Sequence, residues 1–327
     1  MTDPVVVESV LTGGYNLRDQ SGFLRVQGNN PLPIELRKPI VTSLRHVLGN
    51  FQPPSPLTLF PDDNLSIKLR TWGALLLRRY FRDLLAKNRS AALDKMVDNF
   101  VRTSIIRDAT RGRRVPTGFY HQIWRRASLD LSQYQPQSSC QDLVDIVLTS
   151  EVDPQDRGEL YLRLVLSCVG FTSTALEWVI LQMGRDNHPP SDARNVFLEC
   201  QRRYPTAWRL LRELDGEQLF EGIRCEDQQA VVLSTHSVHN SSQHWNGPDR
   251  FDPARWDSVE PPASIYLPFG RGSGSCPGAG FATTTVISIA EALYESFTVR
   301  RIVTKGRPLV LTFAAPPRGT IQLRRRS

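Results

Sequence analysis

Two stretches of the chain repeat apolar residues with the period of a helix. Over 67–106, leucine, valine, methionine and aromatic residues recur three or four positions apart on two successive faces, which predicts two amphipathic helices. The second stretch, 157–183, is apolar nearly all round its middle, a pattern typical of a buried helix. Gly170 lies inside it and is soon followed by three hydroxyl residues, which can hydrogen-bond to carbonyls one turn earlier and bend the helix.

Shorter elements are expected elsewhere. The pattern predicts helices over 191–203 and 282–297 and a short one around 120–128. Strand-like alternation occurs at 5–7, 23–26, 219–223 and 230–233, and 309–313 with 320–323 is expected to form a terminal hairpin. The stretch 107–140 is otherwise expected to be irregular, and 1–65, rich in proline and glycine, resists assignment. We therefore predict one domain over 1–327, mainly α-helical with small β-sheets.

Composition narrows the possible functions. The net charge of +7 comes mostly from arginine, but no aromatic residues are interleaved with the basic clusters as nucleic-acid stacking would need, so we expect no nucleic-acid partner. Five cysteines form no CxxC pair, which favours a reducing, cytoplasmic compartment over a disulfide scaffold. We expect no apolar run of membrane-spanning length and so no membrane span. His236, His239 and His244 lack a carboxylate at ligand spacing and are expected on the surface.

One cysteine stands in unusual surroundings. Cys276 ends a glycine-rich run that starts at Phe269, and Pro277 follows it at the expected start of a helix. Glycines at 270, 272, 274 and 278 allow positive φ and a close approach of the backbone to a flat ligand. Free N–H groups at a helix start favour thiolate over thiol. The alternative is a glycine-rich turn around an inert cysteine.

Two upstream charge motifs precede this loop in a fixed order. Glu199 and Arg202 are three residues apart on a predicted helix, so their side chains share a face and can pair. The run Phe-Asp-Pro-Ala-Arg then supplies Arg255 shortly before the loop. This order, ending in Phe-x-x-Gly-x-x-x-Cys-x-Gly, closely resembles the cytochrome P-450 superfamily, and the resemblance is strongest over 169–300.

The resemblance implies a haem-binding core over 157–327 in which Cys276 is the axial ligand of haem b iron. Phe269, Gly270, Arg271 and Gly278 would complete the cofactor-binding loop. Glu199, Arg202 and Arg255 would form a buried structural triad beneath the haem. Arg212 would bind a haem propionate, and Trp72 with Arg78 or Arg79 would reach a propionate from the other side, although their spacing differs from the family pattern.

The family's distal segment, in which a small residue and glycine precede an acid and threonine, matches residues 169–173. Gly170 would leave room for a small iron ligand, and Thr172 and Ser173 would take the catalytic positions. Thr172 stands where the acid is expected and Ser173 where threonine is, so proton delivery to dioxygen is in doubt. A basic residue is also missing at Gly274, for which Arg271 is a possible substitute. The chain is short for the family, and the deficit falls before the long helix, in the region that caps the substrate pocket.

The leading interpretation is thus a haem-thiolate monooxygenase that oxidises an apolar or natural-product small molecule, with electrons from a ferredoxin-like donor. One alternative is a haem-thiolate enzyme that does not activate dioxygen and is instead peroxide-driven or an isomerase, dehydratase or cyclase. Another is a non-catalytic family member that recruits or stabilises a biosynthetic partner. The substrate and the oligomeric state are not readable from the sequence.

Overall fold

The structure is a computed structural model that describes residues 1–13, 24–28, 30–87, 90–111, 117–137, 139–220, 222–258 and 260–327. Its backbone divides into two compact units. We call Met1–Gly22 with Arg194–Cys276 the cysteine-loop unit, and Phe23–Ala193 with Pro277–Ser327 the helical unit. Each is described by itself.

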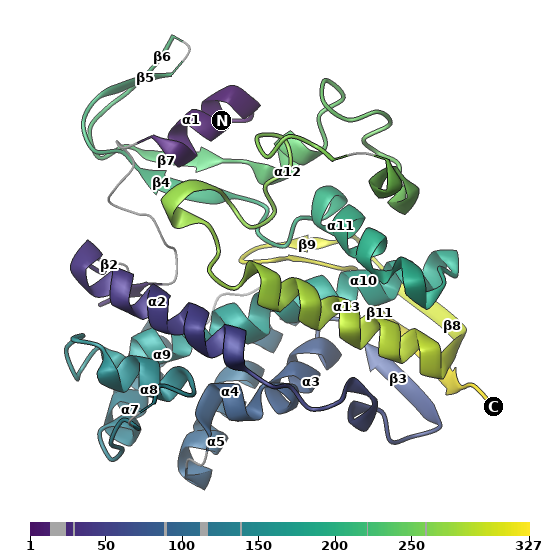
Figure 1. Ribbon diagram of the computed structural model, residues 1–327, viewed down its shortest axis with the longest axis horizontal. Helices are drawn as coiled ribbons and strands as arrows, with labels where there is room; N and C mark the ends of the chain where they lie inside the picture. Colours follow the sequence, from purple (N-terminus) through teal and green to yellow (C-terminus); the bar gives the residue numbers. More distant parts are fainter. Residues whose placement is uncertain are drawn as a thin grey trace. The chain divides into compact units, whose positions relative to one another are not determined.

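Most helices of the chain belong to the helical unit (Figure 1). Its α-helices are α2 (Ile34–Asn50), α3 (Trp72–Tyr80), α4 (Arg82–Ala86), α5 (Ala91–Phe100), α6 (Arg107–Arg111), α7 (Thr117–Leu131), α8 (Leu143–Thr149), α9 (Arg157–Val165), α10 (Thr172–Asp186) and α13 (Ala279–Ser296). One-turn 3₁₀ helices cover Pro56–Leu59 and Pro190–Asp192. The region 67–106, expected to hold two helices, thus contains α3, α4 and α5 after the end of a strand.

The long buried helix is confirmed, but it contains a π-helical segment that the pattern did not predict. α9 and α10 join through Leu166–Phe171, and a similar segment, Val101–Ile106, follows α5. A π turn widens the helix and is often found at functional sites. α10 ends at Asn187, whose φ of 53° is the left-handed conformation common at helix ends.

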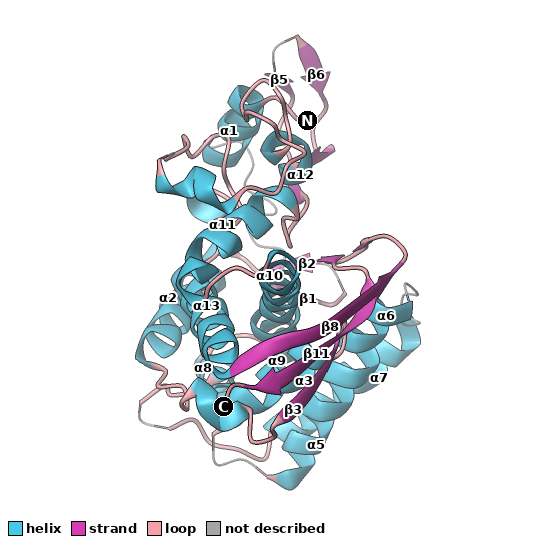
Figure 2. Cartoon of the chain, turned by 90° about the vertical axis from the view of Figure 1, so that its right-hand side faces the viewer, coloured by secondary structure: helices cyan, strands magenta, loops and turns pink. Residues whose placement is uncertain are grey.

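A three-stranded antiparallel sheet completes the helical unit, with strand order β3–β11–β8 (Figure 2). The strands are β3 (Asn64–Lys68), β8 (Phe297–Lys305) and β11 (Arg318–Arg325). Ile321 faces Ile67 on one side and Ile302 on the other, and the register shifts between Gln322 and Leu323.

The prediction of a terminal hairpin between 309–313 and 320–323 is wrong. Residues 320–323 lie in β11, whereas β9 (Leu309–Val310) pairs with β10 (Ala314–Ala315). β1 (Arg25–Val26) and β2 (Asn30–Pro31) form a further small pair, so the strand expected at 23–26 is found in part; Phe23 lies outside the described residues.

The cysteine-loop unit contains α1 (Pro4–Thr12), α11 (Ala193–Arg203), α12 (Thr235–His239) and two strand pairs, β4 (Leu210–Glu213) with β7 (Ala230–Leu233) and β5 (Gln218–Phe220) with β6 (Ile223–Cys225). Short 3₁₀ helices lie at Pro253–Asp257 and Gly272–Gly274. The prediction of strand at 230–233 is confirmed. Of the piece expected at 219–223, residues 219–220 lie in β5 and 223 lies in β6, which pairs with it, while 221 lies outside the described residues.

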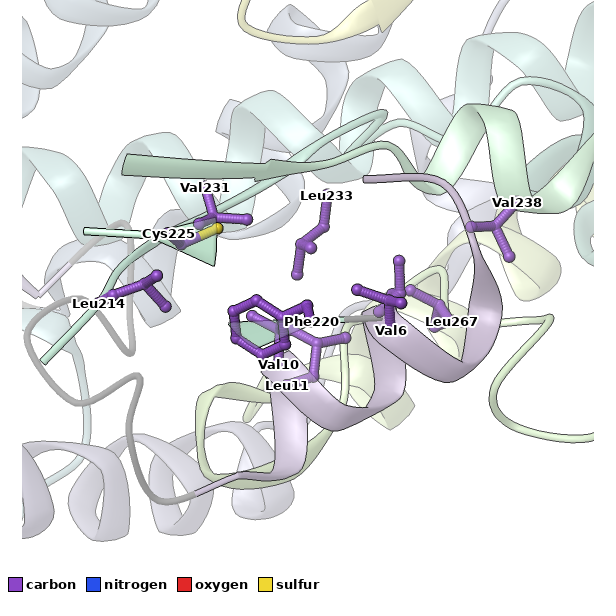
Figure 3. Packing of buried hydrophobic residues seen from close by; sticks show 11 residues of the cluster. Val6, Val10, Leu11, Leu214, Phe220, Cys225, Val231, Leu233, Val238 and Leu267 are labelled. Carbon is purple, nitrogen blue, oxygen red and sulfur yellow. The ribbon is translucent and has the colours of Figure 1, made fainter. Parts of the chain in front are cut away.

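The three valines at 5–7 are helical rather than extended. Asp3 accepts hydrogen bonds from the backbone N–H of Val5 (2.9 Å) and Val6 (3.2 Å) and so caps α1, with Pro4 at its first position. Val6, Val10 and Leu11 then pack against buried residues of the strands, such as Phe220 of β5 and Leu233 of β7. Leu267, just before the cysteine loop, belongs to the same core (Figure 3). The cap and this burial outweigh the β propensity of valine.

Candidate functional site

The loop that carries Cys276 is held by its own backbone hydrogen bonds. The Cys276 N–H donates to the Phe269 carbonyl (2.9 Å), and the Gly270 N–H donates to the Leu267 carbonyl (3.1 Å). Gly270 and Gly272 both have a φ of +70°, which a residue with a Cβ rarely adopts. Two of the four glycines therefore have the positive φ expected of them, and Gly274 and Gly278 do not.

Helix α1 supports the loop within the same unit. A Cβ at Gly272 would lie 2.3 Å from the Leu11 carbonyl oxygen, so this glycine allows a backbone approach to α1. The Arg271 guanidinium pairs with Glu8 of α1 at 2.9 Å. Arg271 thus helps to hold the loop against α1, and its role as a substitute for the basic residue missing at Gly274 stays a prediction. Gly278 lies in the helical unit, where a Cβ would come 3.1 Å from the Leu48 Cδ1 atom.

All five cysteines lie in described parts of the chain, and Cys276 differs from the others by being exposed. Burial raises the pKa of the Cys140 thiol to about 11, with Asp145 and Asp142 acting in the same direction. Burial also raises the pKa of Cys200 well above its usual value, helped by Glu199. A ligand to iron must be a thiolate, so these two buried or half-buried thiols are poor candidates compared with Cys276.

The predicted triad forms around a fully buried carboxylate. The two Glu199 oxygens accept hydrogen bonds from Arg202 Nε (2.9 Å) and Nη2 (2.8 Å). Arg255 Nε lies 3.5 Å from Glu199 Oε2 and completes the group. The Glu199 and Arg202 side chains have no exposed surface, and Arg255 is 9% exposed. The three residues thus meet as a buried ionic cluster.

The same cluster ties down the chain that leads to the loop. Arg202 donates to the carbonyls of His239 (2.9 Å), Pro248 (3.0 Å) and Arg250 (3.0 Å). Glu199 also accepts from the Trp256 indole N–H at 3.1 Å. A planar guanidinium that binds a carboxylate and several carbonyls together fixes this irregular segment without regular secondary structure.

His239 is buried at this cluster, so the expectation that it lies on the surface is wrong; His236 and His244 are exposed. Its Nε2 accepts from the Leu267 N–H at 2.9 Å, close to the start of the cysteine loop. Burial, with a smaller contribution from Arg202, lowers the pKa of His239 to about 3, so the ring is neutral. No group of three or more metal-ligating side chains that could hold a metal ion is found in the described chain.

Arg212 is a buried cation without a described carboxylate partner. It lies in β4, is 5% exposed and donates from Nη1 to the neighbouring Leu211 carbonyl at 2.8 Å. Burial lowers its pKa to about 10. A buried guanidinium is costly unless an anion accompanies it, so the site fits a carboxylate ligand such as a haem propionate.

The structure does not bring Trp72 and Arg78 together. The Trp72 ring stacks on Phe60, with centroids 6.3 Å apart, at the start of α3. Arg78, near the end of the helix, pairs with Asp94 of α5. Positions six apart on a helix lie on different faces, so one ligand is poorly placed to meet both.

Arg37 of α2, in the first 65 residues, is a candidate that the sequence motifs did not mark. It is 8% exposed, its Nε has no hydrogen-bond partner among the described residues, and burial lowers its pKa despite a favourable interaction with Glu35. The apolar positions 40, 44, 47 and 48 of α2 could have revealed the buried face of this helix. Arg78 is equally buried and its Nε also lacks a described partner, but Arg78 already pairs with Asp94, so Arg37 is the better candidate to meet an anionic group.

Of the residues predicted to lie on the ligand side of the iron, Gly170 lies in the π turn of the long helix, and Thr172 and Ser173 follow it at the start of α10. Ser173 Oγ and Thr174 Oγ1 both donate to the Gly170 carbonyl at 3.0 Å, which confirms the predicted return of hydroxyls to the preceding turn. Thr172 and Ser173 are each 4% exposed. The space beside Gly170 is not open: a Cβ there would lie 2.8 Å from Phe313 Cζ.

A buried acid, Glu177, lies one turn after Ser173. Its carboxylate accepts from the backbone N–H of Arg70 (2.5 Å) and Gly73 (2.9 Å) and so meets the start of α3. Burial raises the pKa of Glu177 to about 7, because desolvation outweighs these N–H donors.

We expect Glu177 to make the protein less stable as the pH rises from about 4.5 to about 7. Its folded-state pKa exceeds its unfolded value of 4.5, so the unfolded chain loses this proton first and the folded state is penalised. The penalty reaches on the order of 3 kcal/mol above the folded-state pKa. Urea unfolding across this range should show a larger fall in the wild type than in Glu177→Gln; parallel curves would contradict the shift.

One continuous helical stretch, Arg157–Asp186, has the length and apolar composition of a membrane span, which corrects the expectation that no apolar run is long enough. However, 83% of its most apolar window is buried inside the structure, as in the core helix of a soluble protein. It is therefore weak evidence for a membrane span.

Comparisons with known proteins agree with this architecture. The cytochrome P450 family model matches residues 193–320. The chain is 33% identical over 102 residues to a Mycobacterium tuberculosis protein designated cytochrome P450 132, covering 31% of this chain and 22% of that protein. It is 25% identical over 203 residues to beta-amyrin 11-oxidase of Glycyrrhiza uralensis, covering 51% and 41%. The chain thus spans less than half the length of these relatives.

Solved structures show the same fold over the whole chain. The thermophilic cytochrome P450 from Sulfolobus tokodaii superposes with a TM-score of 0.71 at 16% identity, covering 100% of this chain and 94% of that one. A six-coordinated cytochrome P450 from Thermus thermophilus gives 0.69 at 18% identity, covering 100% and 91%. The chain thus matches the cytochrome P450 family model over its C-terminal part and has the fold of these cytochromes P450 over its whole length.

Proposed function

We propose that the protein is a haem-thiolate monooxygenase in which Cys276 coordinates the iron of haem b. The exposed Cys276 in its glycine-supported loop is the observation that carries this proposal, since the other cysteines are buried or half-buried. A bound haem would supply oxidation chemistry that no side chain of the chain offers. Phe269 and Gly270 shape the loop on which this ligand stands.

The described residues fit an anionic cofactor. Arg212 is a buried guanidinium without a described carboxylate partner, and the Nε of the buried Arg37 has no hydrogen-bond partner among the described residues; a haem propionate is a carboxylate of the kind that each would bind. We assign the propionate role to Arg212, as the sequence predicts, and to Arg37 in place of Trp72 and Arg78. The triad of Glu199, Arg202 and Arg255 supports the loop and takes no part in chemistry.

An apolar or natural-product small molecule is the proposed substrate. Several relatives carry names that refer to beta-amyrin, among them a beta-amyrin 28-monooxygenase of Solanum lycopersicum, 26% identical over 125 residues, which supports an apolar substrate class. Electrons would come from a redox partner, for which we retain a ferredoxin-like donor. The burial of the long apolar helix argues against this helix crossing a membrane, and we retain a cytoplasmic location as part of the proposal.

The residues proposed for the ligand side of the iron offer hydroxyls in place of an acid. Ser173 is neutral near pH 7 and its Oγ–H is already donated to Gly170, so it can relay a proton but cannot be the net source. This arrangement, together with the Phe313 ring beside Gly170, favours as second candidate a haem-thiolate enzyme that does not activate dioxygen.

The test is the reduced carbon monoxide difference spectrum of the purified protein, which reports haem and thiolate ligation together. Oxidation of a test substrate with a ferredoxin and its reductase then separates the two candidates. Turnover with the reductant supports the monooxygenase; a thiolate-type spectrum without reductant-driven oxidation supports the second candidate; no haem spectrum overturns both.

A further inference from the structure

The three-stranded sheet of the helical unit holds the positive excess of the chain. Its strands β3, β8 and β11 contain seven lysine and arginine residues and no aspartate or glutamate. The whole chain has 40 basic and 33 acidic residues, so its net charge of +7 equals the charge on this sheet. Outside the three strands, basic and acidic residues are equal in number.

One face of this sheet is buried and the other is turned outward. Ile321 and Leu323 of β11 are buried, so the alternate residues of the strand, among them Arg318 and Arg324, face outward. Both arginines are exposed. In Figure 2 the sheet is seen in front of helices of the same unit.

The pairing of the strands places three more cations on the outward face. Residues directly opposite each other on neighbouring antiparallel strands point to the same side of a sheet. Lys68 of β3 and Arg301 of β8 lie opposite outward residues of β11, and Lys305 of β8 lies opposite Arg318. These cations extend about 20 Å along β11 and about 10 Å across the strands. We call Lys68, Arg301, Lys305, Arg318 and Arg324 the basic sheet face.

The charge of the basic sheet face is not compensated within the described chain. Of its five side chains, only that of Arg318 has a hydrogen-bond partner there, the Thr110 carbonyl of α6, and none pairs with an acid. Asp63, directly before β3, pairs with Arg325 at 3.1 Å. Like charges that lie directly opposite each other on neighbouring strands, as Lys305 and Arg318 do, destabilise a sheet.

Protection of the sheet edges does not explain these charges. Charged side chains on edge strands keep a sheet from pairing with other chains, and β3 and β8 are the edges here. Acids would serve this purpose as well as bases, and the central strand β11 also carries two cations of the face. A single sign of charge on all three strands instead suits a partner of the opposite sign.

The side chains of the basic sheet face suit a protein better than a membrane or a nucleic acid. Its outward positions in the three described strands include no aromatic residue, so nothing on it can stack on exposed bases. Val303, 37% exposed, is the one apolar side chain among them, whereas binding to a lipid surface usually buries several large apolar residues. Arginine is enriched in protein interfaces, where its planar guanidinium binds a carboxylate through two hydrogen bonds.

We propose that the basic sheet face docks an acidic protein, which contacts it with a run of aspartate and glutamate side chains. Successive outward residues of a strand are about 7 Å apart, so an extended acidic segment laid along β11 has the same side-chain spacing. Its alternate carboxylates would then lie near the cations of the face. No residue of the face belongs to the proposed haem site, so the inference goes beyond the proposed function and does not rest on it.

The probe is a fluorescent poly-glutamate peptide, and its binding to the purified full chain is measured by fluorescence anisotropy. Arg301→Gln with Arg324→Gln should weaken binding about 10-fold, the expected effect of losing two exposed ion pairs. Lys68→Gln with Lys305→Gln removes cations of the two edge strands and should weaken binding to a similar extent. Binding to the wild type should also fall as the salt concentration rises.

The matched control removes two exposed cations elsewhere in the helical unit. Arg82→Gln with Lys95→Gln changes α4 and α5 and lowers the net charge by the same amount, so it reports the general attraction of a basic protein for the peptide. It should weaken binding less than about 2-fold. Urea midpoints show that each variant is folded, and removing cations that repel each other should not lower the midpoint of the sheet variants.

Equal losses in the sheet variants and in the control would show that the peptide has no particular site, and would overturn the proposal. So would unchanged binding in both sheet variants, or no binding by the wild type. Vesicles containing phosphatidylglycerol and a DNA duplex serve as competitors at equal concentrations of anionic groups. If either displaced the peptide more strongly than unlabelled poly-glutamate does, the partner would be a lipid surface or a nucleic acid instead of an acidic protein.

Discussion

Replacing Cys276 with serine should abolish the thiolate-type spectrum of the reduced carbon monoxide complex. A serine hydroxyl is not ionised near neutral pH and does not replace a thiolate as an iron ligand, so the effect should be complete rather than partial. The change is nearly isosteric, and Cys276 is exposed, so the fold should survive it. The spectrum, the haem content and the urea midpoint together measure the result.

Cys140→Ser is the matched control for this experiment. Cys140 is half-buried, and burial raises its pKa, so it is not expected to ligate iron and its serine variant should keep the wild-type spectrum. If Cys276→Ser retained the thiolate-type band, the assignment of the axial ligand would be wrong. If Cys140→Ser lost the thiolate-type band, the iron ligand would be Cys140 and not Cys276.

Glu199→Gln should cost the protein about 3–5 kcal/mol of stability, because it leaves two guanidinium groups buried without their counter-charge. Arg202 has no exposed surface, and Arg255 is nearly as buried, so water cannot compensate for the lost carboxylate. Such a loss is a large share of the net stability of a domain, so little folded, haem-loaded protein should be recovered. Denaturant unfolding and haem content per chain measure it.

The control is an exposed pair in the same unit. Glu217 bonds Arg224 at 2.8 Å with both side chains more than half exposed, so Glu217→Gln should change the stability by less than about 1 kcal/mol. An unchanged urea midpoint in Glu199→Gln would contradict the triad. A lower turnover per bound haem, with unchanged stability, would instead indicate a catalytic role.

Comparison of the elements shows where local sequence suffices. The helix over 157–183 and the strand at 230–233 follow from apolar periodicity, because the period repeats over enough residues to outweigh other preferences. The valines at 5–7 show the limit of this approach. Three β-branched residues predict a strand, but the cap at Asp3 and burial of Val6 against distant strands make them helical.

Contacts between residues far apart in the chain could not be predicted from local sequence patterns. β11 pairs with β3, more than 200 residues earlier, and no local pattern names that partner. The assignment of Trp72 and Arg78 rested on a resemblance to the family pattern, which does not show that the Trp72 ring stacks on Phe60 or that Arg78 pairs with Asp94. Arg37 became a candidate only through its burial.

By itself, the sequence determined the mainly helical class, the exceptional position of Cys276 and the order of the charged motifs, because helical period, glycine φ freedom and motif spacing are local properties. The tertiary structure alone decided that Glu199 also accepts a hydrogen bond from Trp256, that Arg271 pairs with Glu8 and that Phe313 covers Gly170. Each of these depends on contacts between segments far apart in the chain. The contacts of Glu199 and Phe313 are also buried, where desolvation and packing outweigh local preference.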